Sequence, residues 1–461
     1  MLFSSISFLY IFLPVILLLY FIVPFKAKNY VLLIGSLFFY FVGEPIYVTL
    51  LLFSSLSDYL HSLYIESHRG TKGAKVALFS SIVINLGMLG FFKYADFFIG
   101  SINGLLGTSI PLFGVELPIG ISFFTFQTMS YTIDVYRGEA KAERNLATFA
   151  TFVCLFPQLI AGPIVRYTDI SAELHNRKHT LENVYMGIRR FVFGLAKKVL
   201  IANAMGEFCN HFRDSQASVA FYWLYAVAFT LQIYFDFSGY SDMAIGLGRI
   251  FGFTFPENFN YPFISKSITE FWRRWHMTMG GWFRDYIYIP LGGNRCKKFR
   301  WLLNIFIVWA TTGLWHGAAW NFVLWGLFFG ILLVIEKIAL GEFLKKIGFL
   351  RYLYVWILIL ISFVIFNATS MAGLWTDLKG MFGAVPLWNV ETGFYLREYA
   401  PIFILALIGS TPLCKHLWAK TSARYKIMDA IAEPVAIVAL LTAVTASLVS
   451  GSLNPFLYFR F

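Results

Sequence analysis

A run of 35 residues, from Trp301 to Ile335, contains no Asp, Glu, Lys or Arg. About 20 apolar residues already span the hydrocarbon core of a bilayer, so this run is long enough to lie within a membrane. As a single helix it would measure roughly 52 Å, which predicts either one long bent helix or two shorter ones. The run therefore constrains the chain to the fold of a membrane protein.

The rest of the chain repeats this pattern. The 461 residues are 58% hydrophobic and 13% charged, whereas soluble domains carry about 25% charged residues. A β-barrel would show short alternating segments instead of long apolar runs. We therefore expect an all-α polytopic membrane protein with about 11–13 transmembrane or re-entrant helices. The further apolar segments lie near 6–25, 30–43, 46–64, 76–99, 118–135, 146–163, 185–205, 219–237, 351–368, 400–412 and 433–450.

No low-complexity linker divides the sequence, which predicts a single domain over residues 1–461. No internal repeat is visible either, which disfavours a transporter built from inverted repeats. The four cysteines are scattered without a Cys-x-x-Cys pair, so we expect no structural disulfide and no metal site.

The net charge of +12 favours a membrane orientation signal over nucleic-acid binding in so apolar a chain. Basic loops near 26–28, 68–75 and 137–144 fall on one side if the segments between them alternate, and basic loops stay in the cytoplasm. The nearly charge-free loop at 100–116 then faces outward, as does the N-terminus. The first apolar segment lacks the basic start of a signal peptide and is expected to remain as a helix.

The segment from Lys266 to Arg300 holds eight basic and two acidic residues, a net charge of +6, together with three Trp and two Tyr. Arg and Lys bind phosphates and indole rings can stack on a purine, so an anionic-cofactor site is one interpretation. A lipid-headgroup anchor is the other. The candidate cofactor-binding residues are Trp272, Arg273, Arg274, Trp275, Asn294 and Arg295, the last two beside a Gly-Gly turn that brings backbone N–H groups close to a ligand.

Residues 265–281 are expected to form one helix, with Ser267 and Glu270 as a capping box. Glu270 lies three and four residues before Arg273 and Arg274, which predicts a local ion pair. His276 would then lie one turn beyond Arg273. It is a candidate catalytic residue, with a hydrogen-bonded structural ring as the alternative.

His316 lies near the middle of the charge-free run, where a titratable ring is costly to bury. Glycines on both sides leave room for another helix or a ligand, and Thr312 one turn earlier could orient a ring nitrogen. Such a histidine suits a general base that takes a proton from a hydroxyl attacking a thioester. No Ser or Cys nucleophile with an adjacent base is evident, so direct transfer or a transient acyl-histidine is favoured. A structural histidine is the alternative.

Three further polar residues are candidates for supporting roles. Asp236 and Tyr240 share a face of an apolar segment, where Asp236 could orient a histidine or pair with a basic residue. Gln158 lies between Pro157 and Pro163, which end or kink a helix, and could line a cavity.

Five segments in this order resemble the membrane-bound O-acyltransferase family. They are Phe156-Pro-Gln-Leu-Ile-Ala-Gly-Pro163, Tyr234-Phe-Asp-Phe-Ser-Gly-Tyr-Ser-Asp-Met243, Ile268-Thr-Glu-Phe-Trp-Arg-Arg-Trp-His276, Arg284-Asp-Tyr-Ile-Tyr-Ile-Pro-Leu-Gly-Gly-Asn-Arg295 and Gly313-Leu-Trp-His-Gly317. The similarity extends nearly end to end, including residues 454–461, and is greatest to the branch that acetylates alginate or peptidoglycan.

The resemblance implies a helical disc around a central funnel or tunnel, with His316 catalytic and His276 as the second family histidine. It also implies acetyl-CoA as donor, no permanently bound cofactor and an extracytoplasmic partner of the SGNH-hydrolase type. The setting would be the bacterial cytoplasmic (inner) membrane, crossed many times, and the acceptor an extracytoplasmic polysaccharide. A polytopic transporter, or a family member acting on a lipid or protein, is the alternative.

Overall fold

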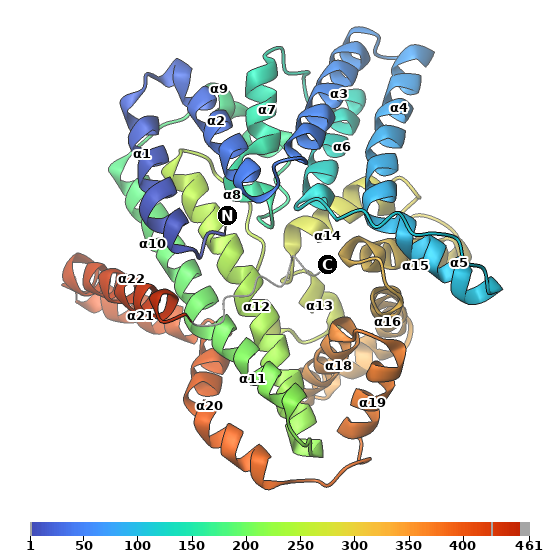
Figure 1. The fold of residues 1–461 in the computed structure, drawn as a ribbon, viewed down its shortest axis with the longest axis vertical. Helices are drawn as coiled ribbons and strands as arrows, with labels where there is room; N and C mark the ends of the chain where they lie inside the picture. The colour runs from blue at the N-terminus through green and yellow to red at the C-terminus, as the bar shows by residue number, and fades with distance from the viewer. Residues whose placement is uncertain (1, 426, 452–461) are drawn as a thin grey trace. The chain divides into compact units, whose positions relative to one another are not determined.

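The computed structural model describes residues 2–425 and 427–451, and every regular element within these ranges is a helix (Figure 1). This confirms the all-α fold of a polytopic membrane protein. The terminal segment 454–461, which contributes to the family resemblance, lies outside the described residues.

Six helices in the described ranges are long and apolar enough to cross a membrane, or seven if one bent pair is a single span. The expected 11–13 segments included short and re-entrant elements, and several of the predicted segments are indeed short or broken helices. The candidate spans are Phe25–Gly43, Lys72–Leu106, Val219–Ile250, Trp320–Lys346, Leu350–Asn367 and Met428–Val449, and the bent pair is Val390–Gly409 with Leu413–Arg424.

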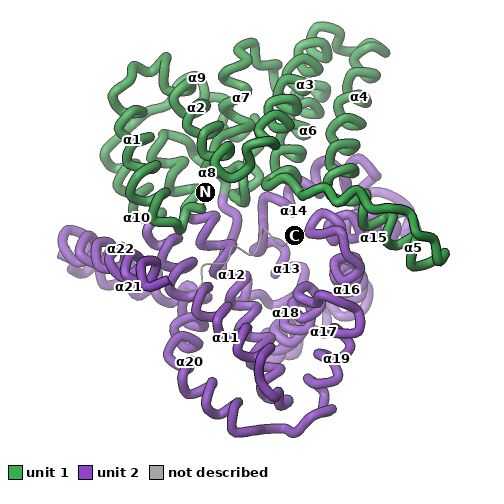
Figure 2. The backbone as a smooth tube through the Cα atoms, viewed as in Figure 1, with its two compact units in different colours: residues 1–191, 243–256 green, residues 192–242, 257–461 purple. Residues whose placement is uncertain are grey.

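The chain divides into two compact units, one of residues 1–191 and 243–256 and the other of residues 192–242 and 257–461 (Figure 2). Neither unit is one continuous stretch, and two helices, α10 (Leu181–Ala196) and α12 (Val219–Ile250), run through the division. The single domain expected over residues 1–461 stays a prediction.

The first unit contains the N-terminal helices and the last residues of α12. Its other elements are η1 (Phe8–Phe12), α1 (Leu13–Ile22), α2 (Phe25–Gly43), α3 (Val48–Ser67), α4 (Lys72–Leu89), η2 (Gly90–Tyr94), α5 (Ala95–Leu106), α6 (Ile121–Arg137), α7 (Leu146–Cys154), α8 (Phe156–Leu159), α9 (Tyr167–His175) and most of α10.

Two of the basic loops expected on the cytoplasmic side meet in this unit. Arg69 donates a hydrogen bond to the carbonyl of Val135 over 2.9 Å, and Glu66 accepts one from the backbone of Ala142 over 2.9 Å. The hydroxyl of Tyr47, at the other end of α3, donates to the carbonyl of Glu116. The loops near 68–75 and 137–144 are thus at one end of α3 and the loop ending at 116 is at the other, as alternating segments require.

The second unit carries the chemistry-bearing motifs of the sequence. Its elements are η3 (Lys197–Ala202), α11 (Asn203–Asp214), most of α12, η4 (Pro262–Ile264), α13 (Ile268–Trp272), α14 (Met277–Phe283), η5 (Arg284–Tyr288), α15 (Lys298–His316), α16 (Trp320–Ile335), η6 (Glu336–Leu340), α17 (Gly341–Lys346), α18 (Leu350–Asn367), α19 (Met371–Met381), α20 (Val390–Gly409), α21 (Leu413–Arg424), η7 (Met428–Ala432) and α22 (Glu433–Val449).

The charge-free run forms the second of the two predicted structures, a pair of helices, α15 and α16, joined at residues 317–319. Glycines let the two backbones touch: a Cβ added to Gly313 would overlap the carbonyl of Phe322, and one added to Gly326 would overlap the carbonyl of Trp309. Small residues permit such close approach between helices in membranes. Because Gly313 meets residues 322 and 326 while Trp309 meets residues 326 and 330, the two helices run antiparallel.

Candidate active site

His316 is the last residue of α15, and its side chain is buried against aromatic rings from its own unit. The ring lies edge-on to Trp325, with centroids 4.9 Å apart, and to Phe366 at 5.4 Å. The room expected beside the glycines is filled by a helix, because the ring of Phe322 occupies the position where a Cβ on Gly317 would lie. His316 is therefore held in an aromatic setting at the turn of the α15–α16 hairpin.

Thr312 does not direct its proton to the histidine. Its hydroxyl donates to the carbonyl of Val308 over 2.7 Å, the usual back-bond of a threonine within a helix. The side chain instead lines the cavity described below.

His276 lies at a break in the helix predicted for residues 265–281, and that prediction is wrong. The segment forms α13 and α14, and His276 between them has a φ of +43° and a ψ of +52°, in the left-handed region. The preceding loop causes the break by taking over backbone groups: Asn260 N donates to the carbonyl of Arg274, and Met277 N donates to that of Asn258, each over 2.9 Å.

Ser267 is the N-cap of this segment, as predicted, and its hydroxyl accepts a hydrogen bond from Glu270 N. Only this half of the predicted capping box forms, because the Glu270 carboxylate accepts from Lys266 N and not from Ser267 N. Glu270 also forms the predicted ion pair, with Arg274 over 3.0 Å. A second carboxylate, that of Glu336, accepts the N–H groups of Ile268 and Thr269. The first turn of α13 is thus capped from two directions.

The ring of His276 is completely buried and lies 4.6 Å from Phe237 and 5.8 Å from Trp315, measured between centroids. Trp315 is also 5.1 Å from the ring of His316, so one indole contacts both histidines. Burial lowers the pKa of His276 well below its usual value, and the nearby His316 lowers it further. His276 is outside the candidate spans, and both effects favour its neutral form.

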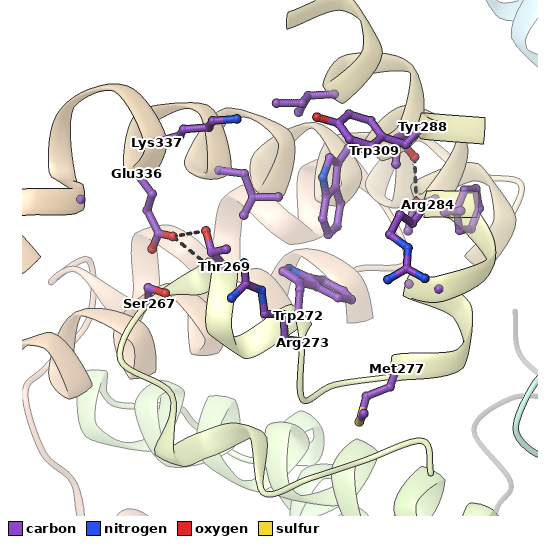
Figure 3. Close-up of a pocket in the computed structure, with 18 of the residues that line it drawn as sticks. Ser267, Thr269, Trp272, Arg273, Met277, Arg284, Tyr288, Trp309, Glu336 and Lys337 are labelled. Atoms are coloured by element: carbon purple, nitrogen blue, oxygen red, sulfur yellow. Dashed lines mark hydrogen bonds between the residues drawn. The ribbon is translucent and has the colours of Figure 1, made fainter. Parts of the chain in front are cut away.

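A cavity of about 1010 Å³ opens in the same unit (Figure 3). Typical ligand cavities measure about 300–1,000 Å³. Six basic side chains and one carboxylate, that of Glu336, belong to its lining. The basic residues are Lys266, Arg273, Arg284, Lys337, Lys345 and Arg351.

Aromatic rings form the other part of this wall. Trp272 and Trp309 lie edge-on at 4.7 Å and both border the cavity. In Figure 3, Arg273 and Arg284 extend into the space beside the two indoles. Arg284 is paired with Asp285, whereas Arg273 has no acidic partner among the described residues. The cavity can therefore accept a ligand that combines anionic groups with a flat ring.

The cavity is connected to His316 through Trp325. The ring of Trp272 in the cavity wall lies 5.6 Å from that of Trp325, which in turn contacts His316. Thr312 on α15 and Gly280 on α14 also line the cavity, each four residues along the chain from one of the two histidines. Neither histidine belongs to the lining, but each of these two lining residues is about one helical turn along the chain from one of the imidazoles.

Of the six candidate cofactor-binding residues, Trp272 and Arg273 line this cavity and four do not. Trp275 is part of the hydrophobic core, where its ring stacks on Phe271. Arg274 is instead paired with Glu270, four residues earlier in the chain.

Asn294 and Arg295 are exposed and lie outside the cavity lining. The Gly292-Gly293 turn beside them has two positive φ angles, of 106° and 54°. It is held from within the protein, since the amide of Asn304 donates to the carbonyls of Leu291 and Gly293.

The supporting candidates occupy separate places. Asp236 forms an ion pair of 2.7 Å with Lys198, and both side chains are only 3% exposed. Of the two roles considered for Asp236, the structure therefore shows pairing with a basic residue. Tyr240 is buried one turn further along α12. Gln158 belongs to the first unit, where its amide donates to the carbonyl of Phe152.

One part of the cavity is not predicted from the sequence, namely the wall formed by Trp309, Lys337 and Arg351. One signal could have found it. Two antiparallel helices within residues 301–335 bring the basic residues before the run and those after it to the same end of the hairpin. The length of the run is also compatible with a single long helix, which would keep the two groups of basic residues apart.

Within the described ranges, no group of three or more His, Cys, Asp or Glu side chains is arranged to hold a metal ion.

Comparison with known proteins adds independent information. The family model described as "MBOAT, membrane-bound O-acyltransferase family" matches residues 112–375. A probable alginate O-acetylase of Azotobacter vinelandii is 39% identical over the whole of both chains. A peptidoglycan O-acetyltransferase of Helicobacter pylori is 35% identical, covering 83% of this chain and 80% of the relative. A teichoic acid D-alanyltransferase of Bacillus subtilis is 31% identical over 47% of this chain and 58% of its own.

Proposed function

Because the chain belongs to the membrane-bound O-acyltransferase family and is a multi-pass membrane O-acyltransferase, we propose that it transfers acetyl groups from cytoplasmic acetyl-CoA for O-acetylation of an extracytoplasmic polysaccharide. The enzyme class sets aside the transporter alternative. The setting we propose is the bacterial inner membrane.

The observation that carries this proposal is the basic, tryptophan-lined cavity, whose wall is separated from His316 by the ring of Trp325. A coenzyme A thioester has phosphates for Arg and Lys and an adenine for an indole. Arg273 has no acidic partner among the described residues and lies next to Trp272 in the chain, so its guanidinium can bind a phosphate beside an indole. The thioester would then extend toward the aromatic shell of His316.

In the proposed reaction, a hydroxyl oxygen of the acceptor attacks the carbonyl carbon of the acetyl thioester. A C–O bond forms, the C–S bond breaks, and the hydroxyl proton passes to His316 and then to the departing thiolate. This is general-base work followed by general-acid work by one imidazole. A transient acetyl-histidine is the alternative. With radiolabelled acetyl-CoA, this intermediate would leave label on the protein before the acceptor is added.

Polysaccharide is the proposed acceptor because the names of the two relatives specify acetylation of alginate and of peptidoglycan. We propose that an extracytoplasmic protein of the SGNH-hydrolase type places the acetyl group on the sugar. Either polymer fits the proposal, and each is supplied separately in the experiment below.

His316→Ala is expected to abolish acetyl transfer without preventing insertion or folding, because it removes the proton acceptor and leaves the surrounding rings in place. Purified protein in nanodiscs is given radiolabelled acetyl-CoA, an SGNH-type partner and either alginate or peptidoglycan, and label on the polymer is measured. His416→Ala, which changes an exposed histidine on α21, is the matched control and should transfer at the unmodified rate.

Normal transfer by His316→Ala would contradict the role of this histidine. Label that never leaves CoA with the unmodified protein would contradict the donor. Label found instead on lipid or on a protein would favour the other acceptor classes of the family.

A further inference from the structure

Asn258 lies in the loop between α12 and η4, and its side chain is completely buried. The amide joins three segments of the second unit. Its nitrogen Nδ2 donates to the hydroxyl of Ser241 on α12 over 3.0 Å. Its oxygen Oδ1 faces Nδ1 of His276 at 3.1 Å and the hydroxyl of Thr278 at 2.8 Å.

The orientation of this amide follows from its neighbours. The backbone N–H of Thr278 also points at Oδ1 over 3.4 Å, and a backbone N–H can only donate. The amide atom on this side is therefore the oxygen, which can only accept. Nδ1 of His276 must then carry a hydrogen and donate it to Asn258.

This hydrogen bond decides which nitrogen of His276 is basic. A neutral imidazole carries one hydrogen, so a protonated Nδ1 leaves a lone pair on Nε2. Within the described part of the chain, Nε2 of His276 has no hydrogen-bond partner, although the ring is completely buried. A buried acceptor without a donor is costly, which indicates that a ligand group completes it.

The surroundings of the ring match such a role. Phe237 comes from α12, Phe259 from the loop, and Trp315 with His316 from α15, and of these side chains only His316 titrates. His276 also has a left-handed backbone conformation, which is strained for a non-glycine residue and is concentrated at functional sites.

We propose that Asn258 is a positioning residue of the active site: it holds His276 as the Nδ1–H tautomer, so that the lone pair of Nε2 faces the reaction site beside His316. A lone pair there can accept a hydrogen bond from another N–H or O–H group of the bound substrates, while the proton of the attacking hydroxyl passes to His316. This inference rests on the proposed function, because it assigns the ring a place in the same transfer.

The tautomer is measured directly, without activity. Full-length protein in nanodiscs is labelled with ring-¹⁵N histidine, and the signals of His276 are identified by their loss in His276→Gln. We expect a hydrogen on Nδ1 and none on Nε2. Asn258→Asp, which keeps an acceptor oxygen, should preserve this pattern, whereas Asn258→Leu and the smaller Asn258→Ala should move the hydrogen toward Nε2.

Transfer kinetics supply the second readout. Asn258→Leu is expected to lower kcat tenfold or more at an unchanged KM for acetyl-CoA, and Asn258→Asp to recover most of that loss. Thr278→Ala is the matched control, because it removes the other side-chain donor to the same oxygen and leaves His276 bonded. It should keep both the tautomer and kcat.

The proposal is overturned if unmodified His276 carries its hydrogen on Nε2, or if Asn258→Leu or Asn258→Ala keeps the Nδ1–H pattern. Equal losses of kcat in Thr278→Ala and Asn258→Leu would also overturn it, since they would show that the hydrogen bonds of Asn258 only stabilise the local structure. If the unmodified protein transfers no acetyl group yet shows the expected tautomer, the proposed function fails and the positioning by Asn258 stands.

Discussion

At the scale of single residues, the site separates neighbours that the sequence places together. Arg273 lines the cavity while Arg274 is paired with Glu270, and Trp272 lines it while Trp275 packs in the core. Adjacent residues cannot both face one side of a regular element, and the break before His276 changes their directions again. The residue types predicted an anion site, but only the backbone decided which of each pair belongs to it.

Arg273→Gln is expected to raise KM for acetyl-CoA about tenfold or more, because a charge-assisted hydrogen bond contributes about 1.5–3 kcal/mol. The effect on kcat should be small, since Arg273 would bind donor and transition state alike. Steady-state kinetics at varied acetyl-CoA check this.

Arg295→Gln is the matched control for that variant. It removes the same charge from the same basic segment, at an exposed position outside the cavity lining. Equal increases in KM would show that general attraction by the segment, and not the cavity, binds the donor.

At the scale of elements, the α15–α16 hairpin places His316 at its turn by close backbone contact. The contact depends on Gly313 and Gly326, whose missing side chains leave space for carbonyls of the facing helix. The flanking glycines of the histidine motif thus contribute to helix packing, one of the two possibilities that the sequence left open.

Gly313→Ala is expected to destabilise the protein by about 1–3 kcal/mol, because its methyl group would overlap the backbone of Phe322. Scanning fluorimetry in detergent should show a fall in Tm, with transfer activity falling as the hairpin separates. Gly87→Ala on α4 is the control, since a methyl group there meets nothing within 4 Å. A Tm for Gly313→Ala equal to that of Gly87→Ala would contradict the proposed role of the close contact.

The break between α13 and α14 is the element that sequence periodicity did not predict. Residues 265–281 contain no proline, and helical spacing continues through the segment. The break depends on two backbone hydrogen bonds, one accepted by the carbonyl of Asn258 and one donated by Asn260 N, and both residues are more than a dozen positions away in the sequence. Tertiary partners of this kind override local preference.

At the scale of the whole molecule, membrane orientation is a consequence of charge. The meeting of the loops near 68–75 and 137–144 in the first unit supports their placement on one side. The orientation itself stays a prediction, with these loops in the cytoplasm and the N-terminus outside.

Single cysteines in a cysteine-free background test this orientation. Ser109→Cys in the charge-free loop should react with a membrane-impermeant maleimide in intact spheroplasts, and Lys141→Cys only after permeabilisation. Both positions are exposed, so a difference in labelling reports the side of the membrane. The reverse pattern would invert the orientation and place the basic loops outside.

The class of molecule could be predicted from local sequence: long apolar runs require membrane helices, and ordered motifs identify an acyltransferase. The sequence also singled out the two histidines, because titratable rings are conspicuous in apolar surroundings. Three features follow only from the folded chain: where the helix breaks, which basic residues enclose the cavity and which side chain faces Nδ1 of His276. These features depend on contacts between residues far apart in the chain, such as Asn258 with His276 and Gly313 with Phe322, and no local pattern encodes such pairs.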